Sequence, residues 1–455
     1  MNALIVISLL GVFAMMAEVT RLRKIILPVI VAGLIAAIVL NVMQWSNPRS
    51  YFSEMIVFDH FAVAFAIAIT AITLLWLFIR PSYFTSNGIR PEIPSLLLFS
   101  LAGAVVMVSY ADLTMLFIGI EILSISLYVL CSSDKLSLRS NEAGLKYFLM
   151  GSFATGFLLF GIALIYGASG SFNLEIIRNY LQTAGDSVPV FFYAGILLMM
   201  VGLLFKVSAV PFHFWAPDVY EGAPAPVSAY MATVVKTAAF AALFRLFSTC
   251  FAEVTAWWAP AFAIIAAITM LTGNIIAVSQ NGIKRLLAYS SVAHAGYILL
   301  AVVAMNEVSA GAVFLYTVAY SLGSLGIFAL AEILGENAQV SDLRGFASRN
   351  PGTALALVIL TFSLAGIPPV AGFFAKYFLF YSTLMSGYTW LVLVAILSSL
   401  IGVYYYFRII YTMYQPLAAD GRSIELASHH RIFFAVLAFL SLLIGVLPGW
   451  LAGLL

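Results

Sequence analysis

Charged residues are scarce in this sequence. Aspartate, glutamate, lysine and arginine make up 9% of its 455 residues, whereas apolar residues make up 63%. A soluble globular protein carries about 25% charged residues, so a soluble fold of this chain would lack the polar surface that water requires. The formal net charge of +2 is also too small to indicate a nucleic-acid or acidic partner. The composition predicts an integral membrane protein in a lipid bilayer and argues against nucleic-acid binding.

Cysteine is almost absent, and so are the short motifs that hold cofactors. The two cysteines, Cys131 and Cys250, stand singly in or beside apolar runs. The sequence contains no CxxC pair, no Cys/His cluster and no glycine-rich phosphate loop. We interpret both cysteines as buried thiols. The local motifs therefore argue against iron–sulfur, haem or zinc ligation by this chain.

Long apolar runs fill the sequence instead. A helix needs about 20 apolar residues to cross the hydrocarbon core, and by that measure the sequence predicts fourteen spans in a single multi-pass membrane domain, residues 1–455. Residues 172–184 have apolar positions at helical spacing and predict a short interfacial helix. The expected spans are residues 2–20, 25–43, 56–79, 93–111, 112–131, 141–167, 188–210, 225–247, 257–280, 283–304, 308–334, 352–386, 389–414 and 430–453.

Basic residues are distributed unevenly between the loops. If the N-terminus is external, most of the loop arginines and lysines, such as Lys24 and Arg139, lie on the internal side. The external side then holds only Arg49, Arg178 and Arg245. The positive-inside rule favours this orientation. An even number of spans then places both termini on the external side.

Six ionisable residues lie inside the expected spans, where a charge costs several kcal/mol and normally faces a protein interior or a wet cavity. Two readings are open for each of them: a proton or ion path, or a structural ion pair or snorkelling side chain. Lys146 fits the structural reading best, because it lies only a turn or two inside its span. Lys236 lies about 15 Å from either end of its span, which is too far for easy snorkelling. The six residues are Glu121, Lys146, Lys206, Lys236, His294 and Lys376.

Lysine and histidine suit proton transfer for different reasons. Burial disfavours the charged form of a lysine, and a nearby carboxylate restores it, so movement of a carboxylate loads or releases a proton. Histidine relays protons near neutral pH. His294 is central in its span and surrounded by small and hydroxyl residues, which favours a relay over a core histidine. For His213, relay and structural roles stay equally open.

Two spans carry prolines in similar settings. Residues 208–215 read SAVPFHFW and residues 365–374 read AGIPPVAGFF, so Ala209-Val210-Pro211 matches Gly366-Ile367-Pro368 at an offset of 157 residues. Proline breaks a helix and frees backbone groups, which membrane proteins tolerate where the backbone is buried in protein or lines a cavity. Paired broken helices indicate inverted repeats around a transport path. Spans 4–8 (about 93–247) and 9–13 (about 257–414) would form two such repeats.

These stretches resemble a known family. GLLFKVSAVPFHFWAPDVYEGAPAPVSAYMATVVKTAAFAALFRL (202–246), NGIKRLLAYSSVAHAGYILL (281–300) and LAGIPPVAGFFAKYFLF (364–380) are similar to the antiporter-like subunit N family of respiratory complex I, the proton-pumping NADH-quinone oxidoreductase. The resemblance covers most of the chain. It implies an all-α fold of fourteen transmembrane helices, with two inverted five-helix repeats and broken helices 7 and 12.

The resemblance also implies roles for single residues. Glu121 and Lys206 match the family's pair on helices 5 and 7, Lys236 the lysine at the channel centre, and Lys376 the residue toward the external exit. Lys146 and His294 match further members of a central polar axis, with Lys284 a weaker candidate. Charge would pass from a Glu121–Lys206 switch to Lys236 and then to Lys376.

The partners and location follow from the same resemblance. The chain would bind no cofactor itself, and flavin, iron–sulfur clusters and quinone would belong to partner subunits. Its partners would be other membrane-arm subunits of complex I in a bacterial inner membrane. A subunit of a Mrp-type cation/proton antiporter, or of a related membrane hydrogenase or dehydrogenase, is the alternative. A structural scaffold would leave the intramembrane lysines and Glu121 unexplained.

Overall fold

The structure is a computed structural model that describes the whole chain except residues 21–22, 82–91 and 418–423. Its residues group into two compact units. The first comprises Met1–Leu74, Arg80–Ser208 and Val234–Ala261, and the second comprises Leu75–Ile79, Ala209–Thr233 and Phe262–Leu455.

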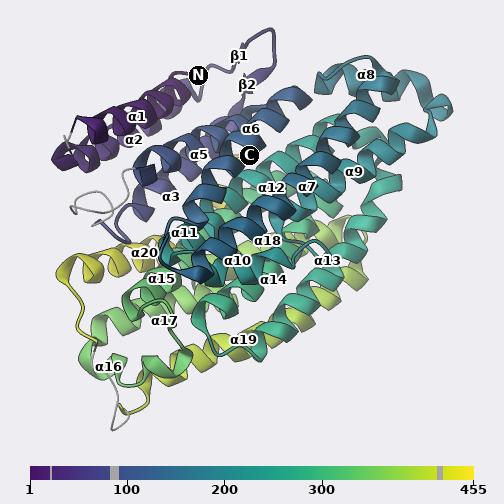
Figure 1. The fold of residues 1–455 in the computed structure, drawn as a ribbon. Helices are drawn as coiled ribbons and strands as arrows, with labels where there is room; N and C mark the ends of the chain where they lie inside the picture. The colour runs from purple at the N-terminus through teal and green to yellow at the C-terminus, as the bar shows by residue number, and fades with distance from the viewer. Residues whose placement is uncertain (21–22, 82–91, 418–423) are drawn as a thin grey trace. The chain divides into compact units, whose positions relative to one another are not determined.

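Helices make up nearly all of both units (Figure 1). The elements up to the first break are α1 (Asn2–Val19), α2 (Arg23–Gln44), β1 (Arg49–Tyr51), β2 (Ile56–Phe58), α3 (His60–Trp76), α5 (Glu92–Ser109), α6 (Leu113–Cys131), α7 (Leu138–Ser169), α8 (Leu174–Ala184) and α9 (Val190–Val207). The elements after it are α10 (Trp215–Gly222), α11 (Ala225–Tyr230), α12 (Lys236–Arg245), α13 (Thr255–Val278), α14 (Ile283–Ala304), α15 (Ser309–Leu334), α16 (Phe346–Arg349), α17 (Pro351–Ala365), α18 (Ala371–Met385), α19 (Thr389–Tyr414), α20 (Ser428–Val446) and α21 (Pro448–Ala452).

The first unit is held together by close helix pairs. α1 packs against α2 and α5, α5 against α6, and α7 against α9 (Figure 1). At the α7–α9 contact, a Cβ on Gly161 would lie 2.7 Å from the carbonyl oxygen of Gly195, which is closer than side chains allow. Small residues let membrane helices approach in this way, because lipid supplies no hydrophobic force between them.

The second unit surrounds α14 and α15. α14 packs against α10, α15 and α18, and α15 also packs against α17 and α20. The α14 and α15 segments are 94% buried inside the protein, whereas α19 and α20 are 39% and 33% buried. α14 and α15 therefore form the interior of this unit, where polar side chains need protein partners.

The predicted amphipathic helix is confirmed as α8. Asn173 caps its first turn by accepting hydrogen bonds from the backbone of Glu175 and Ile176. Its buried residues, Leu174, Ile177 and Leu181, repeat at helical spacing on one face. The β1–β2 hairpin, in which Arg49 pairs with Phe58, was not predicted from the sequence.

Both predicted breaks are confirmed, but their alignment is corrected. Ser208 (φ 63°) caps the end of α9 and Gly366 (φ 83°) caps the end of α17, and both are in the left-handed region. These two caps lie 158 positions apart, so the structure matches Pro211 with Pro369. The offset of 157 residues predicted from the sequence was therefore wrong by one residue. It was based on similar residue types and not on the positions at which the two helices end.

The membrane architecture agrees with the prediction in its coarse features. Eleven helices in the described part of the chain are long and apolar enough to cross a membrane. Three shorter apolar helices cover Asn2–Ala17, His60–Trp76 and Pro351–Ala365. The chain is a multi-pass membrane protein, and the count of fourteen spans and the repeats at about 93–247 and 257–414 stay predictions.

Candidate functional site

Lys206 lies in the last turn of α9 and is buried, with 6% of its surface exposed. Its Nζ donates hydrogen bonds to Ser124 Oγ (2.8 Å) on α6 and to Tyr147 OH (3.1 Å) on α7. The carbonyl end of a helix favours a cation. Lys206 is therefore placed by three helices of the first unit, with neutral hydroxyl groups around its ammonium group.

The predicted Glu121–Lys206 switch stays a prediction, because a switch includes a close and a separated arrangement. Within the described part of the chain, Lys206 has no ion pair within 4.0 Å. Glu121 lies one turn before Ser124 on α6 and is half-buried. Its Oε1 is buried and has no hydrogen-bond partner among the described residues.

Lys146 does not join Lys206. Its side chain is 40% exposed and forms a 2.7 Å ion pair with Glu142, one turn earlier on α7. The next residue, Tyr147, is the one that points inward, with 1% exposed. This placement favours the structural reading of Lys146 that the sequence left open.

Lys236 opens α12 and is buried. The turn directly before it, Met231–Val235, is a π-helical turn, which is wider than an α-helical one. Such turns are rare and often occur at functional sites. No proline or glycine marks this turn in the sequence, so only the structure reveals it.

Lys376 on α18 binds the carbonyl end of the neighbouring broken helix. Its Nζ donates to the carbonyl oxygen of Ala365 (2.7 Å), the last residue of α17, and to Ser399 Oγ (2.8 Å). It also lies 5.0 Å from the centre of the Tyr297 ring, a favourable position for a cation. A Cβ on Gly366 would lie 2.6 Å from Lys376 Cδ, so glycine leaves the space that the lysine occupies.

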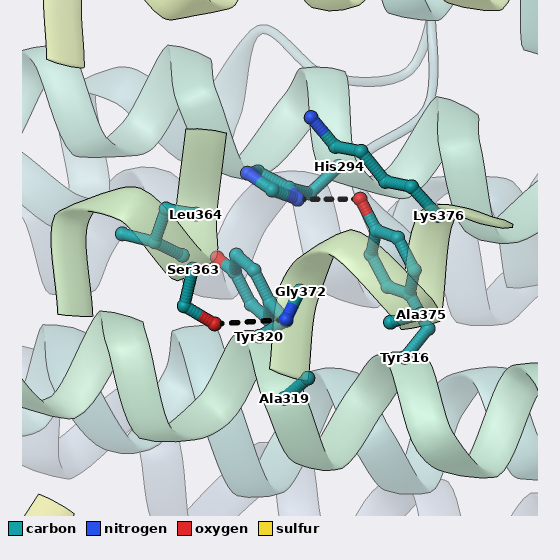
Figure 2. Close-up of a pocket in the computed structure, with 9 residues that line it drawn as sticks. All are labelled: His294, Tyr316, Ala319, Tyr320, Ser363, Leu364, Gly372, Ala375 and Lys376. Atoms are coloured by element: carbon teal, nitrogen blue, oxygen red, sulfur yellow. Dashed lines mark hydrogen bonds between the residues drawn. The ribbon is translucent and has the colours of Figure 1, made fainter. Parts of the chain in front are cut away.

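His294, at the middle of α14, is held at both ring nitrogens. Nδ1 shares a hydrogen bond with Tyr316 OH (2.7 Å), and Nε2 shares one with Tyr406 OH (3.0 Å). His294 and Lys376 line one small cavity together with Tyr316 and Tyr320 (Figure 2). The cavity has room for about one water molecule. The structure thus brings together two of the predicted residues, His294 and Lys376.

His213 and Lys284 stand apart from this cavity. His213 lies in the turn between α9 and α10, and its buried Nδ1 has no hydrogen-bond partner in the described part of the chain. Lys284 Nζ donates to the carbonyl oxygen of Ala223 (2.7 Å). Its neighbour Arg285 pairs with Asp218 (3.1 Å) and Glu221 (2.7 Å) of α10. The polar residues of the WAPDVYEG stretch therefore anchor α10 to α14.

Comparisons with known proteins identify the family of this chain. The family model described as NADH:quinone oxidoreductase/Mrp antiporter matches residues 111–402. NADH-quinone oxidoreductase subunit N of Cytophaga hutchinsonii is 40% identical over 453 residues, and the match covers 98% of each chain. The chain belongs to the NADH-quinone oxidoreductase subunit N family. The subunit N 1 of Herpetosiphon aurantiacus is 42% identical, covering 86% of this chain and 82% of the relative.

Solved structures share the fold of this subunit N family member. A chain of the respiratory complex I from Thermus thermophilus with bound aureothin is 30% identical and has a TM-score of 0.86, covering 99% of this chain and 98% of that one. A chain of the Mrp complex from Dietzia has a TM-score of 0.88 at 21% identity, covering 99% of this chain and 94% of that one. The second likeness shows the fold alone.

In this subunit N family member, sequence reasoning missed the hydroxyl partners of the lysines and His294. Ser124 carries a weak signal, because it lies three residues after Glu121 and so shares its helix face. Tyr147 could be found from the small residues Ala143 and Gly151, which mark the packed face of α7. Ser399, Tyr316 and Tyr406 carry no such signal, because they are ordinary residues of apolar spans.

Proposed function

We propose that the chain translocates protons across the membrane as a subunit of an NADH-quinone oxidoreductase. One observation carries the proposal: Lys206 and Lys376 are buried at the carbonyl ends of the two broken helices, and among the described residues neither has a carboxylate within ion-pair distance. Their partners are hydroxyl and carbonyl oxygens. A lysine in such surroundings gains or loses its proton when a nearby charge moves.

Glu121 supplies the moving charge in this proposal. It lies one turn from Ser124, which binds Lys206. Among the described residues Lys206 has no ion pair within 4.0 Å, and approach of the carboxylate would favour the charged lysine. The change would pass electrostatically to Lys236 and then to Lys376, with His294 as a relay beside Lys376.

Partner subunits complete the site. Glu121 and Lys146 are half-buried in the isolated chain, although both lie in membrane spans. An ionisable group at that depth normally faces protein or a wet cavity rather than lipid. The exposed residues beside Glu121 on α6, Ile118, Ile122 and Ile125, are apolar and suit a packed interface. We therefore place a neighbouring membrane-arm subunit of the complex against this face.

The finer features of the proposal are those the sequence implies. They are fourteen spans, inverted repeats at about 93–247 and 257–414, and both termini on the external side of a bacterial inner membrane. The chain acts as the translocating part of the enzyme and carries no redox centre. Flavin, iron–sulfur clusters and quinone belong to partner subunits.

Alanine variants of Lys206 and Glu121 test the proposal in the intact complex. Proton uptake and NADH oxidation are measured together in inverted membrane vesicles. We expect Lys206→Ala and Glu121→Ala to depress coupled pumping in an assembled complex. Lys135→Ala is the control, because Lys135 is 76% exposed and pairs with Glu92. Full pumping in both variants would refute the assignment.

Purification of the native assembly separates this function from a Mrp-type antiporter. The curated relatives at 40% and 42% identity carry the name subunit N, whereas the likeness to the Mrp complex rests on fold alone. Flavin and iron–sulfur proteins in the purified assembly support the proposal. An assembly without them favours the antiporter.

A further inference from the structure

Ser208, the residue that caps α9, carries two unfavourable features. Its φ is 63°, in the left-handed region that favours glycine. Its side chain is buried, with 1% exposed, and its Oγ has no hydrogen-bond partner in the described part of the chain. A buried hydroxyl without a partner costs free energy, because it has given up its hydrogen bonds with water. Glycine would remove both costs, so the helix end itself does not require a serine.

The corresponding position in the second broken helix is a glycine. Gly366 caps α17 with φ 83°, and the carbonyl oxygen of Ala365, the last residue of α17, accepts a hydrogen bond from Lys376 Nζ (2.7 Å). The carbonyl end of a helix favours a cation, because its last carbonyl groups have no partner within the helix. The end of α17 therefore shows which kind of group suits the end of α9.

The chain leaves α9 in a way that frees a carbonyl group near Ser208. In a continuing helix the backbone N–H of Val210 would bond to the carbonyl oxygen of Lys206, four residues earlier. It donates instead to Thr269 Oγ1 (3.0 Å). The Lys206 side chain does not fill the helix end, because its Nζ donates to hydroxyl groups on α6 and α7. A carbonyl oxygen released from the helix and an unpartnered hydroxyl thus lie two residues apart.

A water molecule matches these two groups. Buried waters make about two to four hydrogen bonds to polar groups that lack protein partners. A serine hydroxyl can also transfer a proton, because it accepts one on its oxygen, releases its own hydrogen and remains a hydroxyl. The carbonyl end of α9 favours positive charge. A water that has taken up a proton would therefore be stabilised there, as the Lys376 amine is at the end of α17.

We propose that the end of α9 binds a proton-carrying water molecule, and that Ser208 is a proton-transfer residue beside Lys206. When Lys206 releases its proton to this water, the ammonium group becomes an amine and the water becomes hydronium. The Ser208 oxygen then takes up the proton and passes its own hydrogen to the next water. Strained residues are concentrated at functional sites, which accounts for a serine at a glycine position. The inference rests on the proposed function, and it adds a residue and a ligand to it.

Two substitutions in the intact complex separate the hydroxyl from the backbone. Ser208→Gly removes the hydroxyl and relieves the strain, whereas Ser208→Thr keeps a hydroxyl and adds strain, because β-branched residues fit the left-handed region poorly. Proton uptake per NADH in inverted vesicles and the unfolding temperature of the purified complex are both measured. We expect Ser208→Gly to lose proton uptake per NADH at an equal or higher unfolding temperature. Ser208→Thr should keep the wild-type ratio at a lower unfolding temperature.

Two control variants match the two parts of the Ser208→Gly change. Met305→Gly relieves strain at a left-handed residue that caps α14 (φ 41°). Ser441→Ala removes another buried hydroxyl without a partner in the described part of the chain. Both controls should keep the wild-type ratio, and a loss in them equal to that in Ser208→Gly overturns the inference.

A purely structural role of Ser208 predicts the opposite pattern. Ser208→Gly would then pump normally, or lose pumping only together with a lower unfolding temperature, and either result overturns the inference. If Ser208→Thr does not assemble, the result for Ser208→Gly decides alone. Lys206→Ala distinguishes this failure from failure of the proposed function. Normal pumping in Ser208→Gly with a loss in Lys206→Ala rejects only the Ser208 site, whereas full pumping in both counts against proton transfer at the end of α9 altogether.

Discussion

Gly366 allows Lys376 to reach the end of α17, and its replacement by alanine should displace the lysine. An L-residue in the left-handed region costs about 1–2 kcal/mol, and Gly366 has φ 83°. The new Cβ would also lie 2.6 Å from Lys376 Cδ and 3.0 Å from Nζ. Moving the lysine breaks its bond to Ala365, and hydrogen bonds of charged groups contribute about 1.5–3 kcal/mol. The total is about 2.5–5 kcal/mol.

Two other glycines separate the backbone effect from the effect on the lysine. Gly387 has the same φ of 83°, but a Cβ there meets nothing within 4 Å. Gly387→Ala should therefore cost only the backbone term of about 1–2 kcal/mol. Gly352 lies in the first turn of α17 with open space around it, and alanine there should be neutral or stabilising.

The assay is proton uptake per NADH in inverted vesicles, together with the unfolding temperature of the purified complex. Gly366→Ala should lower both quantities, Gly387→Ala mainly the unfolding temperature, and Gly352→Ala neither. Equal pumping in Gly366→Ala and Gly387→Ala would show that the space beside Lys376 is not required, and would refute the reasoning.

Three further variants probe other contacts. Ser124→Ala removes a hydrogen-bond partner of Lys206, and this bond contributes about 1.5–3 kcal/mol, so pumping should fall. The control is Ser126→Ala, which should pump normally because the Ser126 hydroxyl bonds to the backbone of its own helix. Tyr406→Phe leaves a buried His294 nitrogen unpaired at a cost of about 1–3 kcal/mol, so pumping and the unfolding temperature should both fall. The control is Tyr404→Phe, at a tyrosine of the same helix that is 60% exposed. An equal loss in the control would contradict this prediction. Arg285→Gln removes two half-exposed ion pairs, each of about 1 kcal/mol or less. The unfolding temperature should therefore fall slightly while pumping persists. Abolished pumping would show that these ion pairs do more than anchor α10.

Hydropathy and helix-breaking residues determined much of this protein directly from the sequence. The spans, the amphipathic α8 and the breaks near Pro211 and Pro368 follow from local chemistry, because lipid demands apolar side chains and a proline or left-handed residue ends a helix wherever it occurs. The sequence also predicts that Lys206, Lys236, His294 and Lys376 lie at membrane depth, because all four fall within the expected spans.

Only the tertiary structure decided what each ionisable group touches. Adjacent residues on a helix point about 100° apart, so Lys146 faces outward while Tyr147 faces Lys206. The packing of neighbouring helices sets that rotation. Ser124 lies 82 residues from Lys206, and Tyr406 lies 112 residues from His294. Such partners depend on how helices far apart in the chain pack together, which no local pattern contains. The two hydroxyl groups that accept hydrogen bonds from Lys206 could not be predicted for the same reason.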